Sequence, residues 1–173
     1  EGRTSDIKVG AIILAAGIET FDPSGHEPYA YGHNPNVVTS VEYEQMQSPL
    51  SPEKGFIKRP SDGKEPRKIA WLQCVGSRDV NRCNVPYCSS VCCMYALKEA
   101  VNTRDFAPET ETTVFYMDMR THGKGYENYL NNALLKGVRL IRSRVHSVNQ
   151  AADTGDVVIS WAEESGNLNE EIF

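Results

Sequence analysis

The five cysteines of this 173-residue chain all lie between Lys68 and Asn102, and they limit what the chain can fold into. Residues 69–72 are a short apolar run, which predicts a buried strand. A loop follows, and then Ser89 or Ser90 is the predicted cap of a helix whose apolar residues recur every three or four positions. A strand, a loop and a helix N-terminus in this order form the place where doubly wound α/β proteins bind a ligand, and here the loop carries thiols.

The spacing of the thiols indicates a metal or iron–sulfur site. Thirteen residues separate Cys74 from Cys88, three more precede the adjacent pair Cys92 and Cys93, and Cys83 lies inside the long gap. Thiolates that converge on one point bind zinc or an iron–sulfur cluster. A disulfide framework is disfavoured, because the number of cysteines is odd and a chain of this size needs no covalent staples.

The choice between zinc and a cluster stays open on spacing alone. Structural zinc sites usually use two pairs of cysteines that are two to four residues apart, and only Cys88 and Cys92 approach that spacing. The pattern also differs from the common ferredoxin motifs, so an unusual cluster is favoured.

Longer motifs resemble HdrA, the iron–sulfur flavoprotein component of heterodisulfide reductase, and its bacterial relatives, which include homologous components of quinone-interacting oxidoreductase complexes. The motifs are CVGSRDV, YCSSVCCMYALKEAV, VFYMDMRTHGKGYENYLNNA and GVRLIRSRV. The resemblance implies a thioredoxin-reductase-like flavoprotein with FAD and several [4Fe-4S] clusters, one of which occupies the place of a pyridine nucleotide. It implies that Cys74, Cys88, Cys92 and Cys93 bind that cluster, and it assigns no ligand role to Cys83.

The resemblance also implies a function. We expect an oxidoreductase subunit that passes electrons between the cluster, FAD and other subunits of a heterodisulfide-reductase-like or quinone-interacting redox complex. A relay of this kind needs no general acid, base or nucleophile, so no catalytic residue is assigned. Because the chain begins at Glu1 without Met, we also expect it to be a piece of a longer protein that is not catalytically complete alone.

The first third of the chain divides into two parts. Residues 1–20 contain the apolar run 9–17, which predicts a strand buried on both faces. The resemblance makes this run the end strand of a flavin-binding domain, with Ala15, Ala16 and Gly17 beside FAD. Residues 21–67 are predicted to be an irregular crossover linker, since Pro and Gly interrupt them repeatedly. Within this linker we expect one short helix, capped by Thr39 or Ser40.

Residues 68–173 are predicted to be an α/β domain: a Rossmann-like parallel sheet with flanking helices, followed by a β hairpin. The expected elements are strands at 68–72, 112–117 and 138–148, helices after Ser90 and at 125–136, a turn at 153–156, a hairpin strand at 157–161 and the start of another strand at the end. This order is the layout of the NAD(P)-type domain of thioredoxin-reductase-like flavoproteins. No GxGxxG motif follows a predicted strand, so dinucleotide binding by this part is not expected.

Charged residues near the cysteines are candidates for tuning a cluster. Arg78 and Arg82 lie in the cysteine loop, and the helix that follows adds partial positive charge at its N-terminus. Arg120 and Lys124 follow the second strand, where they form either a solvated loop or part of the surroundings of the cluster. The four histidines, His26, His33, His122 and His146, are scattered, and none has metal-ligand spacing with the cysteines.

Composition excludes several other functions, and two alternatives remain. The net charge of −5 argues against nucleic-acid binding, no apolar run approaches the roughly 18 residues of a membrane span, and reduced thiols fit the cytoplasm. One alternative is a zinc-stabilised structural or interaction domain that uses the same four cysteines. The other is a thiol–disulfide oxidoreductase with Cys92 or Cys93 as the reactive thiolate, although the chain has no C-x-x-C pair.

Overall fold

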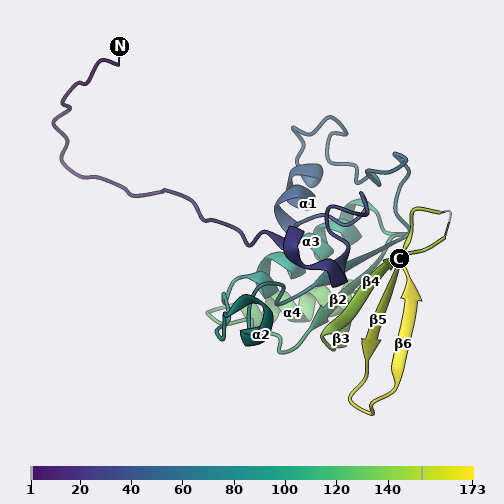
Figure 1. Cartoon of the computed structure of the whole chain (residues 1–173). Helices are drawn as coiled ribbons and strands as arrows, with labels where there is room; N and C mark the ends of the chain where they lie inside the picture. The colour runs from purple at the N-terminus through teal and green to yellow at the C-terminus, as the bar shows by residue number, and fades with distance from the viewer. Residues whose placement is uncertain (1, 153) are drawn as a thin grey trace.

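The described residues of the chain form two three-stranded sheets that pack against each other (Figure 1). The computed structural model describes residues 2–152 and 154–173, so Glu1 and Asp153 of the predicted turn lie outside the described residues. One sheet is parallel, in the order β1-β2-β3, and the other is antiparallel, in the order β4-β5-β6. The strands are β1 Lys68–Leu72, β2 Glu111–Tyr116, β3 Arg139–Arg142, β4 Val145–Gln150, β5 Val157–Ala162 and β6 Leu168–Ile172; the helices are α1 Ser40–Gln47, α2 Val80–Cys83, α3 Cys92–Phe106 and α4 Tyr126–Leu135, with 3₁₀ turns η1 Pro23–Gly25 and η2 Glu27–Tyr29.

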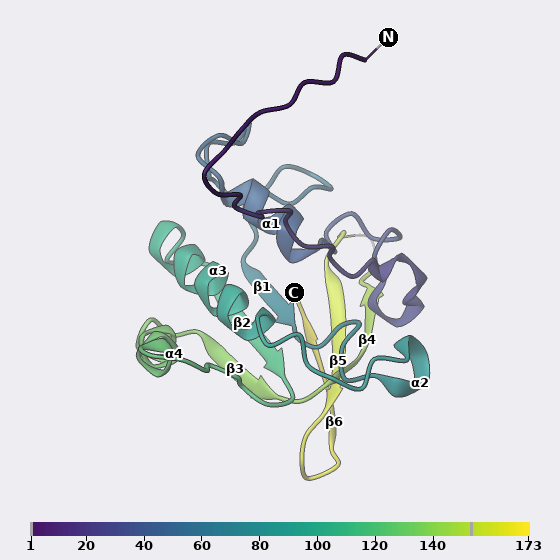
Figure 2. The same cartoon turned by 90° about the vertical axis from the view of Figure 1, so that its left-hand side faces the viewer.

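The parallel sheet is the centre of the fold, and its two faces have different partners. Figure 2 shows α3 and α4 on one side of it and the antiparallel sheet on the other. Successive side chains of a strand point to opposite faces, so Val114 of β2 packs among the helices while Phe115 packs against Trp161 of β5. The order β1-α3-β2-α4-β3 confirms the prediction of an α/β fold, with a parallel sheet and a following antiparallel hairpin.

Several element boundaries agree with the local sequence. Thr39 caps α1, and its hydroxyl and backbone exchange hydrogen bonds with Glu42, as the capping-box pattern predicts. Gly137, with φ of +79°, follows the end of α4 in the left-handed conformation that glycine adopts easily. The hairpin of β4 and β5 forms as predicted, and β6 adds the expected further strand.

Two local predictions were wrong. The single strand expected at 138–148 is two strands, because the chain leaves the parallel sheet at Ser143 and enters the antiparallel sheet at Val145. The residue before α3 is Val91, which makes no side-chain capping hydrogen bond, so neither Ser89 nor Ser90 caps the helix. Ser90 instead has a φ of +65°, which turns the chain into the helix.

The apolar run 9–17 is extended, exposed and without a partner strand among the described residues. Ile13, for example, is 91% exposed, and the segment leads away from the two sheets (Figure 1). A strand is buried only where neighbouring strands and side chains cover it, and the described residues supply neither. The burial expected from the sequence is therefore not found in this chain, while the assignment of the run to a flavin-binding domain stays a prediction. Among the described residues, no helix combines the length and apolar character needed to cross a bilayer.

Candidate metal centre

Four of the cysteines lie where β1 ends and α3 begins. Cys74 comes two residues after β1, and Cys92 and Cys93 are the first two residues of α3. Cys74 itself has a φ of +62°, so the chain turns sharply as soon as it leaves the sheet. Gly76 continues the turn, and a side chain there would collide with the ring of Phe21, whose nearest atom lies 2.2 Å from the position of an added Cβ.

The four thiols are largely withdrawn from solvent. Cys74, Cys92 and Cys93 are buried, the last of them 3% exposed, whereas Cys88 is half-buried. All five cysteines are free thiols. Burial of unpaired thiols is common, but a group of them beside one strand end gives a site with concentrated sulfur ligands.

The pKa values of Cys74, Cys92 and Cys93 depend on neighbouring sulfurs, although within the described residues these sulfurs are not part of a group of three or more ligand atoms that all lie within 4.8 Å of one another. Burial raises the pKa of Cys74, and the negative charges of Cys92 and Cys88 raise it further, while Arg78 opposes them. A hydrogen bond with Cys92 raises the pKa of Cys93, together with burial and the charge of Cys74. The same hydrogen bond, followed in importance by one from Ser89, lowers the pKa of Cys92 to about 6 despite its burial. Cys92 is therefore the thiol that most readily becomes a thiolate.

Hydrogen-bond donors surround the sulfurs. The backbone N–H of Ser90 donates to Cys88 Sγ at 3.3 Å, and the backbone of Arg120 opposes the rise in the pKa of Cys93. The Arg78 side chain opposes the rise in the pKa of Cys74 and pairs with Asp118, at 2.8 Å between Nη2 and Oδ2. Donors of this kind stabilise thiolates and a bound anionic group, so the donor set fits a thiolate-ligated metal or cluster.

Of the other charged residues proposed from the sequence, Arg120 contributes its backbone to the site, as described, and Arg82 and Lys124 are exposed. The backbone N–H of Arg82, in the separate helix α2, donates to Asp79, which caps that helix. Two residues with roles here were not singled out from the sequence for contact with the thiols, namely Ser89 and Asp118. Asp118 lies within one of the motifs, two residues after β2, so its position at the carboxyl end of a strand was the available signal.

The remaining predicted site residues lie elsewhere. Cys83 is at the end of α2, and its sulfur contacts His26 rather than one of the four grouped thiols. Ala15, Ala16 and Gly17 lie in the exposed N-terminal segment, so the structure does not bring them to the cysteines (Figure 1). Their contact with FAD stays a prediction.

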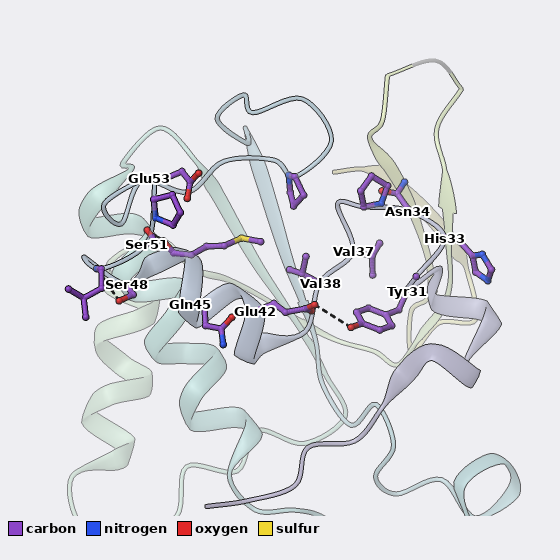
Figure 3. Close-up of a pocket in the computed structure, with 16 residues that line it drawn as sticks. Tyr31, His33, Asn34, Val37, Val38, Glu42, Gln45, Ser48, Ser51 and Glu53 are labelled. Carbon is purple, nitrogen blue, oxygen red and sulfur yellow. Dashed lines mark hydrogen bonds between the residues drawn. The ribbon is translucent and has the colours of Figure 1, made fainter.

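Two hollows lie near this part of the fold. The larger, of about 1380 Å³, is lined in part by Cys74, Cys92, Trp71 and Tyr95, so the thiols border space that a larger group could enter. The smaller, of about 810 Å³, lies between residues 31–38, α1 and the segment after it, and no cysteine lines it (Figure 3). There the Tyr31 hydroxyl donates to Glu42 across the hollow, at 3.3 Å.

The amino-acid sequence of the chain is similar to that of several known proteins. No protein-family model matches the chain. The chain is 47% identical over 153 residues to an iron-sulfur A-type subunit of the CoB–CoM heterodisulfide reductase of Methanopyrus kandleri. It is 42% identical over 154 residues to the A-type subunit of the H(2):CoB-CoM heterodisulfide,ferredoxin reductase of Methanothermobacter marburgensis, and 43% identical over 154 residues to the iron-sulfur A-type subunit of the CoB–CoM heterodisulfide reductase of Methanocaldococcus jannaschii.

The matches cover most of this chain but only part of each relative. Each covers 88% of this chain but 23% of the relative, so the chain spans about a quarter of the length of these relatives. All three relatives are named as components of a reductase, and two of them as its iron-sulfur component. The resemblance seen in the sequence motifs is thereby confirmed.

Proposed function

Because this chain is homologous over most of its length to one segment of the HdrA family of heterodisulfide reductase components, we propose that it is the electron-transfer part of such an oxidoreductase and binds a [4Fe-4S] cluster. The observation that carries the proposal is the position of four free cysteines, three of them buried, where β1 ends and α3 begins. Cys74, Cys88, Cys92 and Cys93 are the proposed ligands. The names of the relatives support iron–sulfur chemistry. The type of cluster is our inference from the four sulfur ligands.

The surrounding residues suit this role. When bound, the cluster would accept and release single electrons. The buried thiolates would hold it away from water, and the lowered pKa of Cys92 supplies one ligand already deprotonated near neutral pH. Arg78, whose positive charge lowers the pKa of Cys74, would stabilise negative charge at the site and so favour the reduced form.

The position of the site supports a further part of the proposal. A ligand at the carboxyl end of a parallel strand, beside the following helix, occupies the place where Rossmann-like domains bind a nucleotide. We infer that the cluster replaces a pyridine nucleotide and that electrons pass to or from FAD, bound near Ala15, Ala16 and Gly17, and onward to other subunits of a cytoplasmic heterodisulfide-reductase-like or quinone-interacting complex. The open hollow beside Cys74 and Cys92 is compatible with a neighbouring cofactor or domain.

Metal analysis tests the proposal directly. After anaerobic purification we expect about four iron and four sulfide per chain, and a paramagnetic resonance signal that changes on addition of dithionite. Cys88→Ala and Cys92→Ala should abolish incorporation of the cluster, whereas Cys83→Ala, as the matched control, should retain it. Full iron and sulfide in Cys88→Ala would overturn the ligand assignment. Bound zinc without iron that is lost in Cys88→Ala and Cys92→Ala but kept in Cys83→Ala would assign these four thiols to a structural zinc domain.

The low pKa of Cys92 favours one second candidate, thiol–disulfide exchange. A thiolate at the start of a helix is the usual nucleophile of such enzymes, and the neighbouring Cys93 is present as a thiol. If this candidate is right, metal-free folded protein will be alkylated rapidly at Cys92 and will reduce a model disulfide. Slow alkylation of Cys92 in the folded, metal-free chain would exclude it.

A further inference from the structure

A histidine, a carboxylate and the fifth cysteine meet on the side of the fold where η1 approaches α2. The ligand atoms of His26, Asp79 and Cys83 all lie within 4.8 Å of one another, and His26 Nε2 is 3.1 Å from Cys83 Sγ. In a tetrahedral zinc site, with bonds near 2.0–2.3 Å, a nitrogen and a sulfur ligand are about 3.5 Å apart. The observed spacing therefore needs only a small opening to surround an ion. None of these residues belongs to the four-cysteine group.

We propose that His26, Asp79 and Cys83 form a second metal site, suited to zinc, that is separate from the four-cysteine centre. Thiolate, imidazole and carboxylate are together the ligands that zinc binds in proteins. The thiolate and the carboxylate place two negative charges beside the ion, and Asp79 shares its charge with Arg144. Three protein ligands leave a fourth position for water or for another ligand.

Each ligand is held in place before a metal binds. Asp79 is 6% exposed, accepts the backbone N–H of Arg82 at the start of α2, and forms an ion pair with Arg144. A carboxylate offers about four lone-pair positions, so these two contacts leave Asp79 able to bind an ion. Cys83 is the last residue of α2, directly before Asn84, which takes a left-handed conformation.

His26 is fixed by aromatic neighbours. The ring of Phe21 meets it edge-on at 5.1 Å between centroids, and that of Tyr29 stacks on it at 6.3 Å. These contacts orient the imidazole toward Cys83, which lies in the loop between β1 and α3. Cys83 is 57 positions after His26 in the sequence. A bound metal would tie the η1–η2 segment to the loop that carries Cys74 and Cys88. The sequence does not predict the site, because residues so far apart carry no spacing signal.

The main competing interpretation is a reactive Cys–His pair, in which His26 activates Cys83 as a nucleophile. If Asp79 completed a catalytic triad with this pair, its carboxylate would accept a hydrogen bond from the second nitrogen of the histidine. In the described part of the chain, Asp79 accepts from Arg82 and Arg144 and makes no hydrogen bond with His26. The convergence of three ligand atoms therefore favours a metal.

The test uses the anaerobically purified chain, with Zn²⁺ as the probe and alkylation of each cysteine followed by mass spectrometry. We expect one zinc per chain to survive gel filtration in addition to any iron. Zinc should slow alkylation of Cys83 at least tenfold in the wild type but not in His26→Ala. The variants Cys83→Ser and His26→Ala should lose this zinc, while His33→Ala, which alters an exposed histidine, should retain it.

The outcomes separate this proposal from the function proposed for the other four thiols. Because alkylation is read at Cys83 itself, a chain that contains no iron still tests the site. Equal zinc retention in wild type and Cys83→Ser would overturn the proposal, and so would rapid alkylation of Cys83 that zinc leaves unchanged, which would indicate the reactive pair. If circular dichroism shows that His26→Ala is unfolded, His26→Gln, which keeps much of the side-chain volume, decides the question.

Discussion

Glu99 is a carboxyl group in the middle of α3, 2% exposed, with the indole Nε1 of Trp71 donating to it at 2.7 Å. Burial raises its pKa to about 7, and the hydrogen bond from Trp71 only partly offsets this. Neither the loop motifs nor the resemblance drew attention to it, because a single Glu inside an amphipathic helix predicts an exposed position. Its indole partner, Trp71, belongs to the apolar core between the parallel sheet and the helices.

We predict that the contribution of Glu99 to the stability of the protein falls as the pH rises from about 4.5 to 7. In the unfolded chain Glu99 ionises near 4.5, before it does in the folded chain, so unfolding releases a proton in this window and is favoured by rising pH. The loss should be on the order of 3 kcal/mol above pH 7. Urea unfolding at pH 5 and pH 8 measures it. Glu99→Gln should remove this part of the pH dependence. If the free energy of unfolding changes by the same amount between pH 5 and pH 8 in wild type and variant, the assignment is wrong.

Arg78 provides a second prediction for a single residue, which rests on the proposed cluster. Its guanidinium carries a positive charge that lowers the pKa of the Cys74 thiol against the effect of burial. Replacement by Gln should lower the reduction potential, because negative charge on the reduced site loses a stabilising neighbour. We expect a change of about 60 mV, which is a factor of ten in the one-electron equilibrium. A redox titration followed by paramagnetic resonance measures it. Arg82→Gln is the matched control, since that side chain is exposed, and an equal shift in both variants would argue against a specific contact.

At the scale of single residues, the sequence indicated the proposed ligands but not their surroundings. The density and spacing of Cys74, Cys88, Cys92 and Cys93 were visible in the chain. The contacts of Ser89 with Cys92 and of His26 with Cys83 were not, because they depend on how a loop with several left-handed residues turns. Short-range capping and periodicity rules do not describe such a loop.

At the scale of elements, α1 is the clearest case of local sequence determining structure. Thr39 accepts the backbone N–H of Glu42 at 3.3 Å, and the Glu42 carboxylate accepts the backbone N–H of Thr39 at 2.6 Å. The helix then places Tyr43 against α3, where its hydroxyl lies 2.7 Å from that of Thr103. The capped helix α1 is therefore held against the apolar core that contains α3.

Thr39→Ala should lower the free energy of unfolding by about 1 kcal/mol, since the backbone N–H of Glu42 loses its partner at the start of the helix. Urea denaturation followed by circular dichroism measures the change. Glu42→Gln is the control, because glutamine preserves the reciprocal hydrogen bond of the capping box and should cost less. A loss in Glu42→Gln as large as in Thr39→Ala would show that charge, rather than the cap, stabilises α1.

Two elements departed from the sequence prediction for different physical reasons. The run 138–148 contains no Gly or Pro, so nothing local marks the break between β3 and β4. The break arises because β3 pairs with β2 while β4 pairs with β5, which is a property of the tertiary structure. The run 9–17 has the composition of a buried strand, but burial requires partners that composition cannot supply.

At the scale of the whole molecule, the two sheets share one interior. Phe115 of β2 is 1% exposed and meets the ring of Trp161, in β5, at 5.1 Å, and that of Phe173 at 6.1 Å. Glu171 of β6 accepts hydrogen bonds from Lys68 of β1 and Arg139 of β3 at the edge of the same contact. The sequence predicted a hairpin after the parallel sheet, but it contained no signal that the hairpin would cover the face opposite the helices.

Because Phe115 connects the two sheets, we predict that they unfold as one cooperative unit. The chain has two tryptophans, Trp71 in the parallel sheet and Trp161 in the antiparallel sheet, so Trp161→Phe and Trp71→Phe leave one fluorescent probe in each. The urea transitions of these two single-tryptophan proteins should coincide with their circular dichroism transitions. Adding Phe115→Ala to either protein should lower the free energy of unfolding by about 3–5 kcal/mol, because it leaves a cavity between the sheets.

Phe115→Leu is the matched control for this experiment, since it keeps most of the apolar volume and should cost clearly less than the alanine variant. Separate transitions for the two probes in the parent proteins would show that the sheets are independent units and that the packing of Phe115 does not couple them. If the sheets are coupled, damage in the antiparallel sheet will also loosen β1 and the start of α3, which hold the cysteines. Under that coupling, Phe115→Ala should speed the loss of bound iron in air, whereas Phe115→Leu should leave the rate close to that of the parent. The antiparallel sheet would then contribute to retention of the metal without supplying a ligand.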